Sequence, residues 1–297
     1  MSKVWLITAS SRGLGRHLAE VVLESGNQLV ATARKPEQLA DLRVKYKDQV
    51  RTTAVDVTDP AAARDAVQTA VAAFGQLDVL VNNAGYGNVA SIEDITDEDF
   101  RAQMETNFYG VVNVTRAALP LLRKQHSGHI IQISSIGGRI GAPGVSAYQS
   151  AKWAVEGFSE VLSKEVAPIG IKVTIVEPGA FRTDWAGSSM QVQEIGEEYQ
   201  PTVGVLVHWR RENNGRQSGD PSKAAKVILH IAELSESPLR LLLGSDAVHL
   251  ARLATEQRAA EDEKWKELSL STDFEGTPSV EERLAPLSKL DENMKRK

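Results

Sequence analysis

Short apolar runs alternate with amphipathic segments along the first 180 residues of the chain. The runs are rich in Val, Ile and Leu, as buried parallel strands are, and they occupy residues 4–8, 28–33, 50–55, 77–81, 129–133 and 171–176. Apolar residues at helical spacing lie between them, in segments expected at 18–23, 36–47, 60–74, 96–125 and 147–168. This alternation predicts an α/β protein with a doubly wound parallel sheet and helices on both of its faces.

Two of these helices begin with recognisable signals. Pro60 stands in the first turn of its segment, where a missing N–H group costs nothing. Thr96-Asp97-Glu98-Asp99 has the pattern of a capping box. The acidic residues of this box are therefore read as charge that favours a helix N-terminus, in preference to a metal site.

Residues 180–220 fall outside the alternation. They are long, polar and rich in expected loops, and a long loop in a compact domain is usually functional or disordered. We therefore expect a functional segment here, with aromatic side chains that contact a ligand or pack the segment onto the body: Trp185, Tyr199 and Trp209.

The end of the chain also changes character. Past residue 268 it is rich in Ser, Pro and charge and has no sustained apolar period. We therefore expect one domain over residues 1–268, and a tail over 269–297 that is mobile or lies on another subunit.

The composition limits the class of protein. The 297 residues can form one α/β domain, and a formal charge of −5 argues against a general binder of nucleic acids or anionic membranes. No apolar run approaches the roughly 20 residues that cross a bilayer. The chain has no cysteine, which excludes disulfides and thiol chemistry, and its six histidines are scattered, which argues against a metal site. The expected location is the cytoplasm.

A glycine turn follows the first strand. Residues 9–15 read Ala-Ser-Ser-Arg-Gly-Leu-Gly and lead into a helix. Strand, glycine turn and helix together place a helix N-terminus and free backbone N–H groups under a pyrophosphate. Gly13 would let the backbone approach the phosphates, and Gly15 would let the helix pack close to the strand. The alternative is an ordinary turn between strand and helix.

Tyr148 and Lys152 form the strongest candidate for chemistry. Four residues apart on a helix, they project from the same face, and an ammonium beside a phenol favours the phenolate and lowers its pKa. Ser135 lies thirteen residues upstream of the tyrosine, and its hydroxyl can bind the same oxygen that the tyrosine protonates. Such a site transfers protons without a metal or a cysteine. A Tyr-x-x-x-Lys pattern also arises by chance, so its weight comes from the motifs around it.

Taken together, these motifs resemble those of the classical short-chain dehydrogenases/reductases. The chain carries the family's pattern in order over about residues 3–245, in the segments Thr8–Gly15, Asn82-Asn83-Ala84-Gly85, Ser135, Tyr148-x-x-x-Lys152 and Pro178-Gly179. The resemblance implies a Rossmann-type sheet of about seven strands, and a lid at about residues 180–220 that closes over the substrate. One position departs from the pattern, because Ala9 stands where the family usually has glycine, and we expect cofactor binding to be weakened there but not lost.

The resemblance also implies roles for individual residues. The catalytic residues would be Asn107, Ser135, Tyr148 and Lys152. Ser134 is the rival of Ser135, but neighbours on a strand point to opposite faces, and the thirteen-residue spacing favours Ser135. The cofactor would be bound by Thr8, Ser10, Ser11, Arg12, Gly13, Leu14, Gly15, Arg34, Asp56, Val57, Asn83, Ala84, Gly85, Tyr148, Lys152, Pro178, Gly179 and Thr183. Among these, Asp56 would accept from the adenine amino group, and Thr183 would meet the nicotinamide carboxamide.

The choice of cofactor depends on the end of the second strand. An NAD site usually has a carboxylate about 20 residues past the glycine turn, hydrogen-bonded to the ribose 2′-hydroxyl. Here that position is Ala33, followed by Arg34, and Arg12 lies within the turn. Two guanidinium groups can converge on a 2′-phosphate, which favours NADP(H). The alternative is that both arginines are solvated surface charges.

We therefore expect an NADPH-dependent oxidoreductase that reduces a ketone or aldehyde to an alcohol, or runs the reverse reaction, with Tyr148 as general acid or base. Stretches similar to hydroxysteroid and retinol dehydrogenase-like members suggest a hydrophobic small-molecule substrate. The resemblance and the two amphipathic helices at about 100–125 and 147–168 imply a homodimer or homotetramer. Two alternatives stay open: a non-catalytic NADP(H)-binding sensor and an NAD-linked alcohol dehydrogenase.

Overall fold

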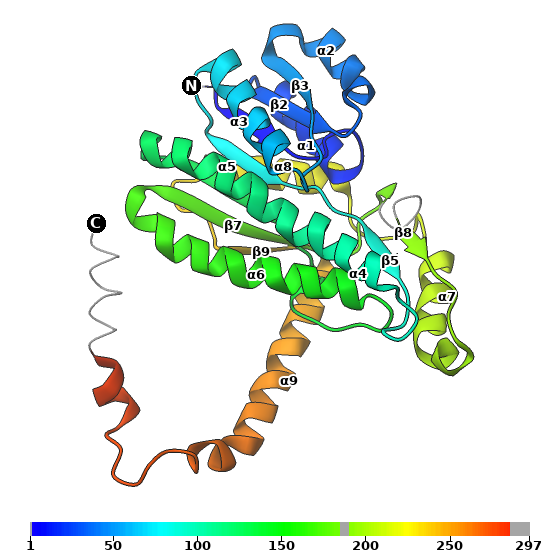
Figure 1. The fold of residues 1–297 in the computed structure, drawn as a ribbon, viewed down its shortest axis with the longest axis vertical. Coiled ribbons are helices and arrows are strands. Elements are labelled where there is room, and N and C mark those ends of the chain that lie inside the picture. The colour runs from blue at the N-terminus through cyan, green and yellow to red at the C-terminus, as the bar shows by residue number, and fades with distance from the viewer. Residues whose placement is uncertain (1, 185–189, 286–297) are drawn as a thin grey trace.

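A seven-stranded parallel sheet forms the centre of the molecule (Figure 1). The computed structural model describes residues 2–184 and 190–285. The strands lie in the order β3-β2-β1-β4-β6-β7-β9. Their bounds are β1 Val4–Ile7, β2 Gln28–Ala33, β3 Val50–Ala54, β4 Val79–Asn82, β6 Gly128–Ile133, β7 Ile171–Pro178 and β9 Arg240–Leu243. The doubly wound α/β fold expected from the sequence is thereby confirmed.

Each face of the sheet has its own core, because alternate residues of a strand point to opposite faces. In β1, Trp5 and Ile7 enter one core, and Val4 and Leu6 enter the other. The first core is covered by α1 (Gly13–Glu24) and α8 (Pro221–Glu233), and the second by α3 (Pro60–Phe74), α5 (Gly110–Gln125) and α6 (Ser146–Val166). Burial on both faces explains why the strands read as continuous apolar runs.

The direction of winding changes between β1 and β4. From β1 the chain passes to β2 and then β3 on one side, whereas β4, β6 and β7 follow on the other side. Ligands of open α/β sheets bind in the crevice outside the carboxyl ends of the strands at such a switch point. The glycine turn after β1 and the Asn82–Gly85 turn after β4 both lie at this crevice.

Two expected helices are more divided than the sequence indicated. The 36–47 segment is a 3-10 turn, η1 (Pro36–Leu39), followed by α2 (Ala40–Tyr46). The 96–125 segment begins as expected, with Thr96 Oγ1 accepting from the Asp99 N–H at 3.1 Å. It then runs as α4 (Asp97–Met104), a π-helical turn η3 (Glu105–Tyr109) and α5.

The 180–220 segment has more secondary structure than the expected polar loop, which corrects that expectation. Strand β8 (Met190–Val192) pairs in parallel with β5 (Gly87–Val89), and a π-helical turn η8 (Gln200–Gly204) leads into α7 (Val205–Glu212). Val203 and Val207 are buried against Val89 and Val145, and this apolar contact stabilises the packing of η8 and α7 on the body. Tyr199 donates a hydrogen bond to Glu93 at 2.6 Å and Trp209 is exposed, whereas Trp185 lies outside the described residues.

The last helix, α9 (Ser245–Leu270), leaves the body of the molecule (Figure 1). In the first turns of α9, Ala247 and Ala251 are buried against the body. Further along, the guanidinium carbon of Arg258 lies 4.8 Å from the centre of the Trp153 ring of α6. Beyond Arg258 every residue of α9 is exposed. The domain boundary expected at 268 thus falls inside this helix. Among the helices of the described segments, none has the length and apolar character that a membrane span requires.

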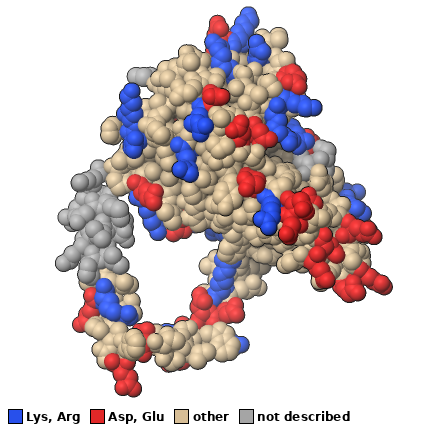
Figure 2. Space-filling view, viewed as in Figure 1, with Lys and Arg blue, Asp and Glu red and all other residues tan. Residues whose placement is uncertain are grey.

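Charge is unevenly spread over the surface. Acidic side chains gather on the side that carries β8 and α7 (Figure 2). Among them, Asp94, Glu194 and Glu197 line a shallow hollow beside Ile195 and Gln200. This outer face of the 180–220 segment is therefore negatively charged.

Candidate active site

Tyr148, Lys152 and Ser135 meet at the carboxyl edge of the sheet. Tyr148 and Lys152 lie in the first turns of α6 and are buried, whereas Ser135 follows β6. The Ser135 hydroxyl accepts from the Gly137 N–H at 3.0 Å and is hydrogen-bonded to the Tyr148 hydroxyl. Ser134 is buried, and its hydroxyl has no partner among the described residues. Ser135, and not Ser134, is thus the serine that reaches the tyrosine.

The surroundings of Tyr148 correct one expectation. From the sequence, the charge of Lys152 is expected to lower the pKa of the phenol. In the structure, burial raises the pKa of Tyr148 to about 12, and the Ser135 hydrogen bond and the charge of Arg210 pull in the opposite direction. The reason is that burial removes water from the phenolate, while Lys152 directs its ammonium to the Ile133 carbonyl oxygen at 2.8 Å.

Lys152 is held by its surroundings. Its Nζ lies 5.7 Å from the centre of the Tyr148 ring. Burial lowers the pKa of Lys152 to about 8, and the Glu156 carboxylate one turn further along α6 opposes this shift. At neutral pH most of the lysine therefore keeps its proton.

Asn107 lies in the π-helical turn η3 and is fully buried. Its Oδ1 accepts from the Tyr86 N–H at 3.2 Å, and its Nδ2 donates to the Tyr86 carbonyl at 3.0 Å. A Cβ placed on Gly85 would lie 2.6 Å from Asn107 Oδ1 and 3.7 Å from Lys152 Nζ, so both side chains border the same glycine. The four expected catalytic residues are thus brought to one site, and π turns are common at functional sites.

The glycine turn has the shape that a diphosphate requires. Gly13 has φ +56°, and a Cβ on Gly15 would come within 3.0 Å of both the Ala9 carbonyl oxygen and the Asn83 amide. The N-terminus of α1 opens at this turn, and its backbone N–H groups suit an anion. Thr183 lies against Gly13, with its Cβ 3.7 Å from where a Gly13 Cβ would stand. The residues present therefore fit a dinucleotide phosphate.

Several expected cofactor residues make structural contacts here. Thr8 Oγ1 accepts from the N–H groups of Asn83 (2.8 Å) and Ala84 (3.0 Å), and Asn83 Nδ2 donates to the Thr8 carbonyl at 3.0 Å. Ser10 is buried and donates to the Ile7 carbonyl at 2.8 Å, so its side chain points away from the solvent side of the turn, whereas Ser11 and Arg12 lie nearer the surface. Leu14 packs on the core.

The adenosine end of the expected site lies at β2 and β3. Arg34 is exposed just past β2. Asp56 Oδ1 accepts from the Thr58 N–H (3.0 Å) and hydroxyl (2.7 Å), which lower the pKa of Asp56, and the charge of Arg34 adds to the shift. Val57 is buried against Gly110. Arg34 and Asp56 are thus near enough to influence one another at the edge of the crevice.

Asp246 fixes the turn after β7, and the sequence analysis did not single it out. Its Oδ2 accepts from the Ala180 N–H at 2.7 Å, and a Cβ on Gly179 would collide with its carboxylate. The Gly179 N–H donates to the Leu243 carbonyl at 2.9 Å. The Pro178-Gly179 turn is therefore held against the start of α9.

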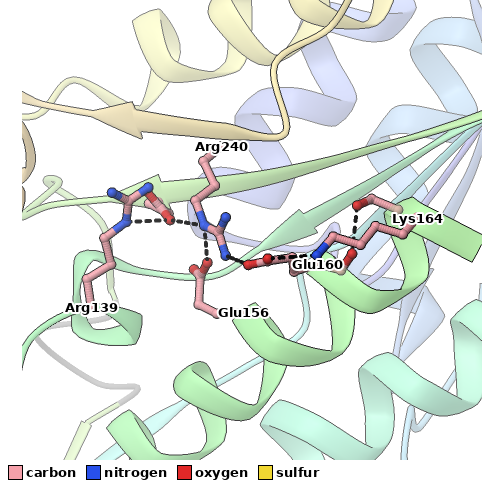
Figure 3. A network of polar contacts seen from close by, with 7 residues as sticks. Arg139, Glu156, Glu160, Lys164 and Arg240 are labelled. Atoms are coloured by element: carbon pink, nitrogen blue, oxygen red, sulfur yellow. Dashed lines mark hydrogen bonds and ion pairs between the residues drawn. The ribbon is translucent and has the colours of Figure 1, made fainter. Parts of the chain in front are cut away.

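A partly buried network of charges joins α6 to the neighbouring strands (Figure 3). Arg240 of β9 pairs with Glu156 (3.1 Å) and Glu160 (2.8 Å) of α6, and Arg139 contacts the Glu177 carboxylate of β7 at 2.8 and 2.7 Å. Burial raises the pKa of Glu177 to about 7, although Arg139 draws it down. The network joins α6, β7 and β9 at the end of the sheet that carries the catalytic residues.

The site and the fold together place the chain in a known family. The family model described as short chain dehydrogenase matches residues 3–194. The chain belongs to this family, which confirms the resemblance found in the sequence.

Comparisons with individual proteins agree with this family assignment. The chain is 55% identical to oxidoreductase BOA17 of Botryotinia fuckeliana over 92% of its own length and 100% of that protein. It is similar to the crystal structure of a short-chain dehydrogenase from Streptomyces avermitilis, with a TM-score of 0.86 and 40% identity over 92% of this chain and 100% of that one. The structure of ElxO with NADP bound matches with a TM-score of 0.69 and 26% identity, over 84% of this chain and 100% of that one.

The conformation of Ala9 gives a prediction about stability. Ala9 has φ +55°, a region in which a Cβ costs about 1–2 kcal/mol. Glycine has no such cost but loses more freedom on folding. We therefore expect Ala9→Gly to raise the free energy of unfolding by roughly 0.5–1 kcal/mol, measured by urea denaturation. Gly26→Ala is the matched control, because Gly26 has φ +81° with open space around it and should show the opposite sign. If Ala9→Gly lowered the free energy of unfolding instead, the backbone at Ala9 would not be strained.

Proposed function

We propose that the protein is an NADP(H)-dependent oxidoreductase that reduces a ketone or aldehyde to an alcohol, or catalyses the reverse. The observation that carries this proposal is the convergence of the Tyr148 and Ser135 hydroxyls and the Lys152 ammonium at one edge of the sheet. Family membership supports the reaction class. A complete set of proton-transfer groups speaks against a sensor that only binds the dinucleotide.

Each of these groups has a task in the reduction. The bound nicotinamide dinucleotide supplies the hydride. The Ser135 hydroxyl holds the carbonyl oxygen of the substrate and draws negative charge onto it. Tyr148, whose pKa of about 12 keeps its proton in place at neutral pH, donates that proton to the same oxygen. In the reverse direction, Tyr148 takes the proton of the alcohol.

Lys152 and Asn107 support the proton transfer. We propose that Lys152 binds the ribose next to the nicotinamide. Asn107, held by the Tyr86 backbone, would maintain a water-mediated path by which Lys152 returns a proton to the site. The remaining cofactor residues named from the sequence keep their proposed roles, with the glycine turn under the diphosphate.

The preference for NADP(H) is part of the proposal. Ala33 offers no carboxylate at the end of β2, and the exposed Arg34 follows it. The match to ElxO, whose structure holds NADP, supports this preference. An NAD-linked alcohol dehydrogenase would need an acceptor for the ribose 2′-hydroxyl at this point.

Arg34→Ala tests the preference. We expect the KM for NADPH to rise about tenfold or more and the KM for NADH to change little, because only NADPH carries the phosphate that the guanidinium binds. Arg34→Ala with Ala33→Asp should shift preference towards NADH, since the new carboxylate repels a phosphate. Steady-state kinetics with both cofactors measure this, with the exposed Arg43→Ala on α2 as control. Equal changes for both cofactors would make Arg34 structural.

The reaction itself is tested by NADPH oxidation with a panel of hydrophobic ketones and aldehydes. Turnover that depends on Tyr148 supports the proposal. Binding of NADPH without turnover on any member would favour the sensor, and turnover only with alcohols and NAD⁺ would favour the NAD-linked alternative.

We also propose a homodimer that pairs through α5 and α6. Exposed aromatic and apolar side chains on and beside these helices support the pairing: Tyr109, Trp153 and Val161. Such isologous pairing is the commonest form of association. The cytoplasmic location and the separate C-terminal tail stay predictions.

A further inference from the structure

Arg210 points from α7 towards the catalytic residues. Val203 and Val207 face the body of the molecule, and Arg210 follows Val207 by three residues, so it projects from the same helical face. Its neighbours His208 and Arg211 are exposed, which leaves Arg210 as the cation that this short helix turns inward.

Arg210 is partly buried, and one nitrogen of its guanidinium has no hydrogen-bonding partner. Nη1 is inaccessible to solvent and has no hydrogen bond within the described part of the chain. No carboxylate of the described residues lies within ion-pair distance of Arg210, and Glu212 is paired with His208 at 3.1 Å. A buried polar nitrogen that lacks a partner is costly, and such an atom calls for an explanation, of which a functional role is one.

The inward face that carries Arg210 lies beside the start of α6. A Cβ on Gly144 would lie 2.7 Å from Val203 Cγ1, and Val145 packs with Val203 and Val207. Tyr148 follows these residues in the first turn of α6. In agreement with this placement, burial lowers the pKa of Arg210 and the interaction with Tyr148 opposes the shift, while the charge of Arg210 lowers the pKa of Tyr148.

The wall beside Arg210 is apolar. Val89, Val145, Val203 and Val207 form a cluster on the inner side of the segment. The acidic residues Asp94 and Glu197 line an open hollow at the surface. Salt screens such surface charges over about 8 Å, so the inward cation dominates within the site.

We propose that Arg210 determines substrate specificity by binding a carboxylate, so that the substrate is an oxo acid with an apolar carbon skeleton. This rests on the proposed carbonyl reduction and names its substrate class. The planar guanidinium pairs with a carboxylate through two parallel hydrogen bonds. The partly buried Ala142 and Met190, which pack on the valine cluster, offer apolar surface to the skeleton. The carboxylate takes no part in the bond changes: the carbonyl carbon gains the hydride and its oxygen gains the Tyr148 proton.

The test compares 2-oxo and 4-oxo acids with their methyl esters. NADPH oxidation is measured with the wild type, Arg210→Gln, Arg210→Lys and the matched control Arg211→Gln. In the wild type, kcat/KM should favour the acids. In Arg210→Gln, the acid-to-ester ratio of kcat/KM should fall about 10- to 100-fold, because a hydrogen-bonded charge is lost. Arg210→Lys should restore part of the ratio, and Arg211→Gln should leave it unchanged.

Other outcomes overturn the proposal. A wild type that prefers the esters, or an Arg210→Gln variant that loses the same factor on acid and ester, would show that Arg210 does not bind a carboxylate. If the equal loss comes with a shifted pH profile, Arg210 acts on Tyr148 instead.

A protein that reduces no member of the panel refutes the carbonyl reduction separately. In that case, calorimetry measures the affinity of the oxo acids for the wild type and for Arg210→Gln, each with NADP⁺ bound. Equal affinity of the wild type and Arg210→Gln refutes the carboxylate site. A tenfold loss of affinity in Arg210→Gln that is absent in Arg211→Gln supports it.

Discussion

Tyr148→Phe is expected to lower the turnover number for carbonyl reduction by about 100- to 10,000-fold and to leave NADPH binding within a few-fold of the wild type. The substitution keeps the ring, which is almost fully buried, and removes only the proton donor. General acid catalysis contributes about that factor to a rate. Because the loss concerns the transition state, it should appear in kcat and not in the affinity for the cofactor.

The measurement is steady-state NADPH oxidation on the best carbonyl of the panel, with cofactor affinity from fluorescence titration. Tyr109→Phe is the matched control, because the same oxygen is removed from an exposed ring beside α5. A Tyr148→Phe enzyme that keeps a third of the wild-type turnover would end the assignment of this residue as the acid.

Gly15→Ala is expected to disrupt the glycine turn. A methyl group at this position would come within 3.0 Å of the Ala9 carbonyl oxygen and the Asn83 amide, and the former is backbone that cannot rotate away. Forcing atoms into a packed site costs about 1–3 kcal/mol. We expect a loss of unfolding free energy of that size and at least a tenfold weaker affinity for NADPH, because the displaced turn no longer presents its N–H groups to the phosphates.

Gly157→Ala is the control for this substitution. Gly157 lies inside α6 with nothing within 4 Å of the added methyl, so the change should stabilise the protein by about 0.5–1 kcal/mol. Urea denaturation and fluorescence titration measure both variants. If Gly15→Ala kept the wild-type free energy of unfolding and affinity for NADPH, α1 would have shifted away from the turn to make room for the methyl group.

Much of the fold and the site could be predicted because their signals are local. The strand runs, the glycine turn and the spacing of Ser135, Tyr148 and Lys152 are each contained in a few consecutive residues. The strands β1 to β7 of the main sheet lie close to their expected positions, since burial on both faces imposes an apolar run. These segments carry the catalytic residues at their ends.

Features that depend on distant contacts were missed. Strand β9 has only four residues and is recognisable as a strand only beside β7. Helix α9 has no continuous apolar face, because its second half contacts nothing in the described body. The inward direction of Arg210 likewise follows from Val203 and Val207 packing against Val89 of β5, a contact between segments far apart in the sequence.

The electrostatics of the site were also beyond the sequence. The four-residue spacing was enough to predict that Tyr148 and Lys152 share one helical face. The pKa of the phenol, in contrast, depends on how much water the surrounding chain removes. The pKa of the buried Glu177 carboxyl behaves similarly, because its neighbour Arg139 comes from another element.

The protruding helix α9 has a practical consequence for the subunit count. Size-exclusion chromatography and translational diffusion report the Stokes radius, and a rod that extends from a compact body increases friction far more than it increases mass. A column calibrated with spherical proteins would therefore assign too large a mass to this chain, and a monomer could pass for a dimer. Sedimentation equilibrium, which is independent of shape, is the measurement that gives the number of subunits.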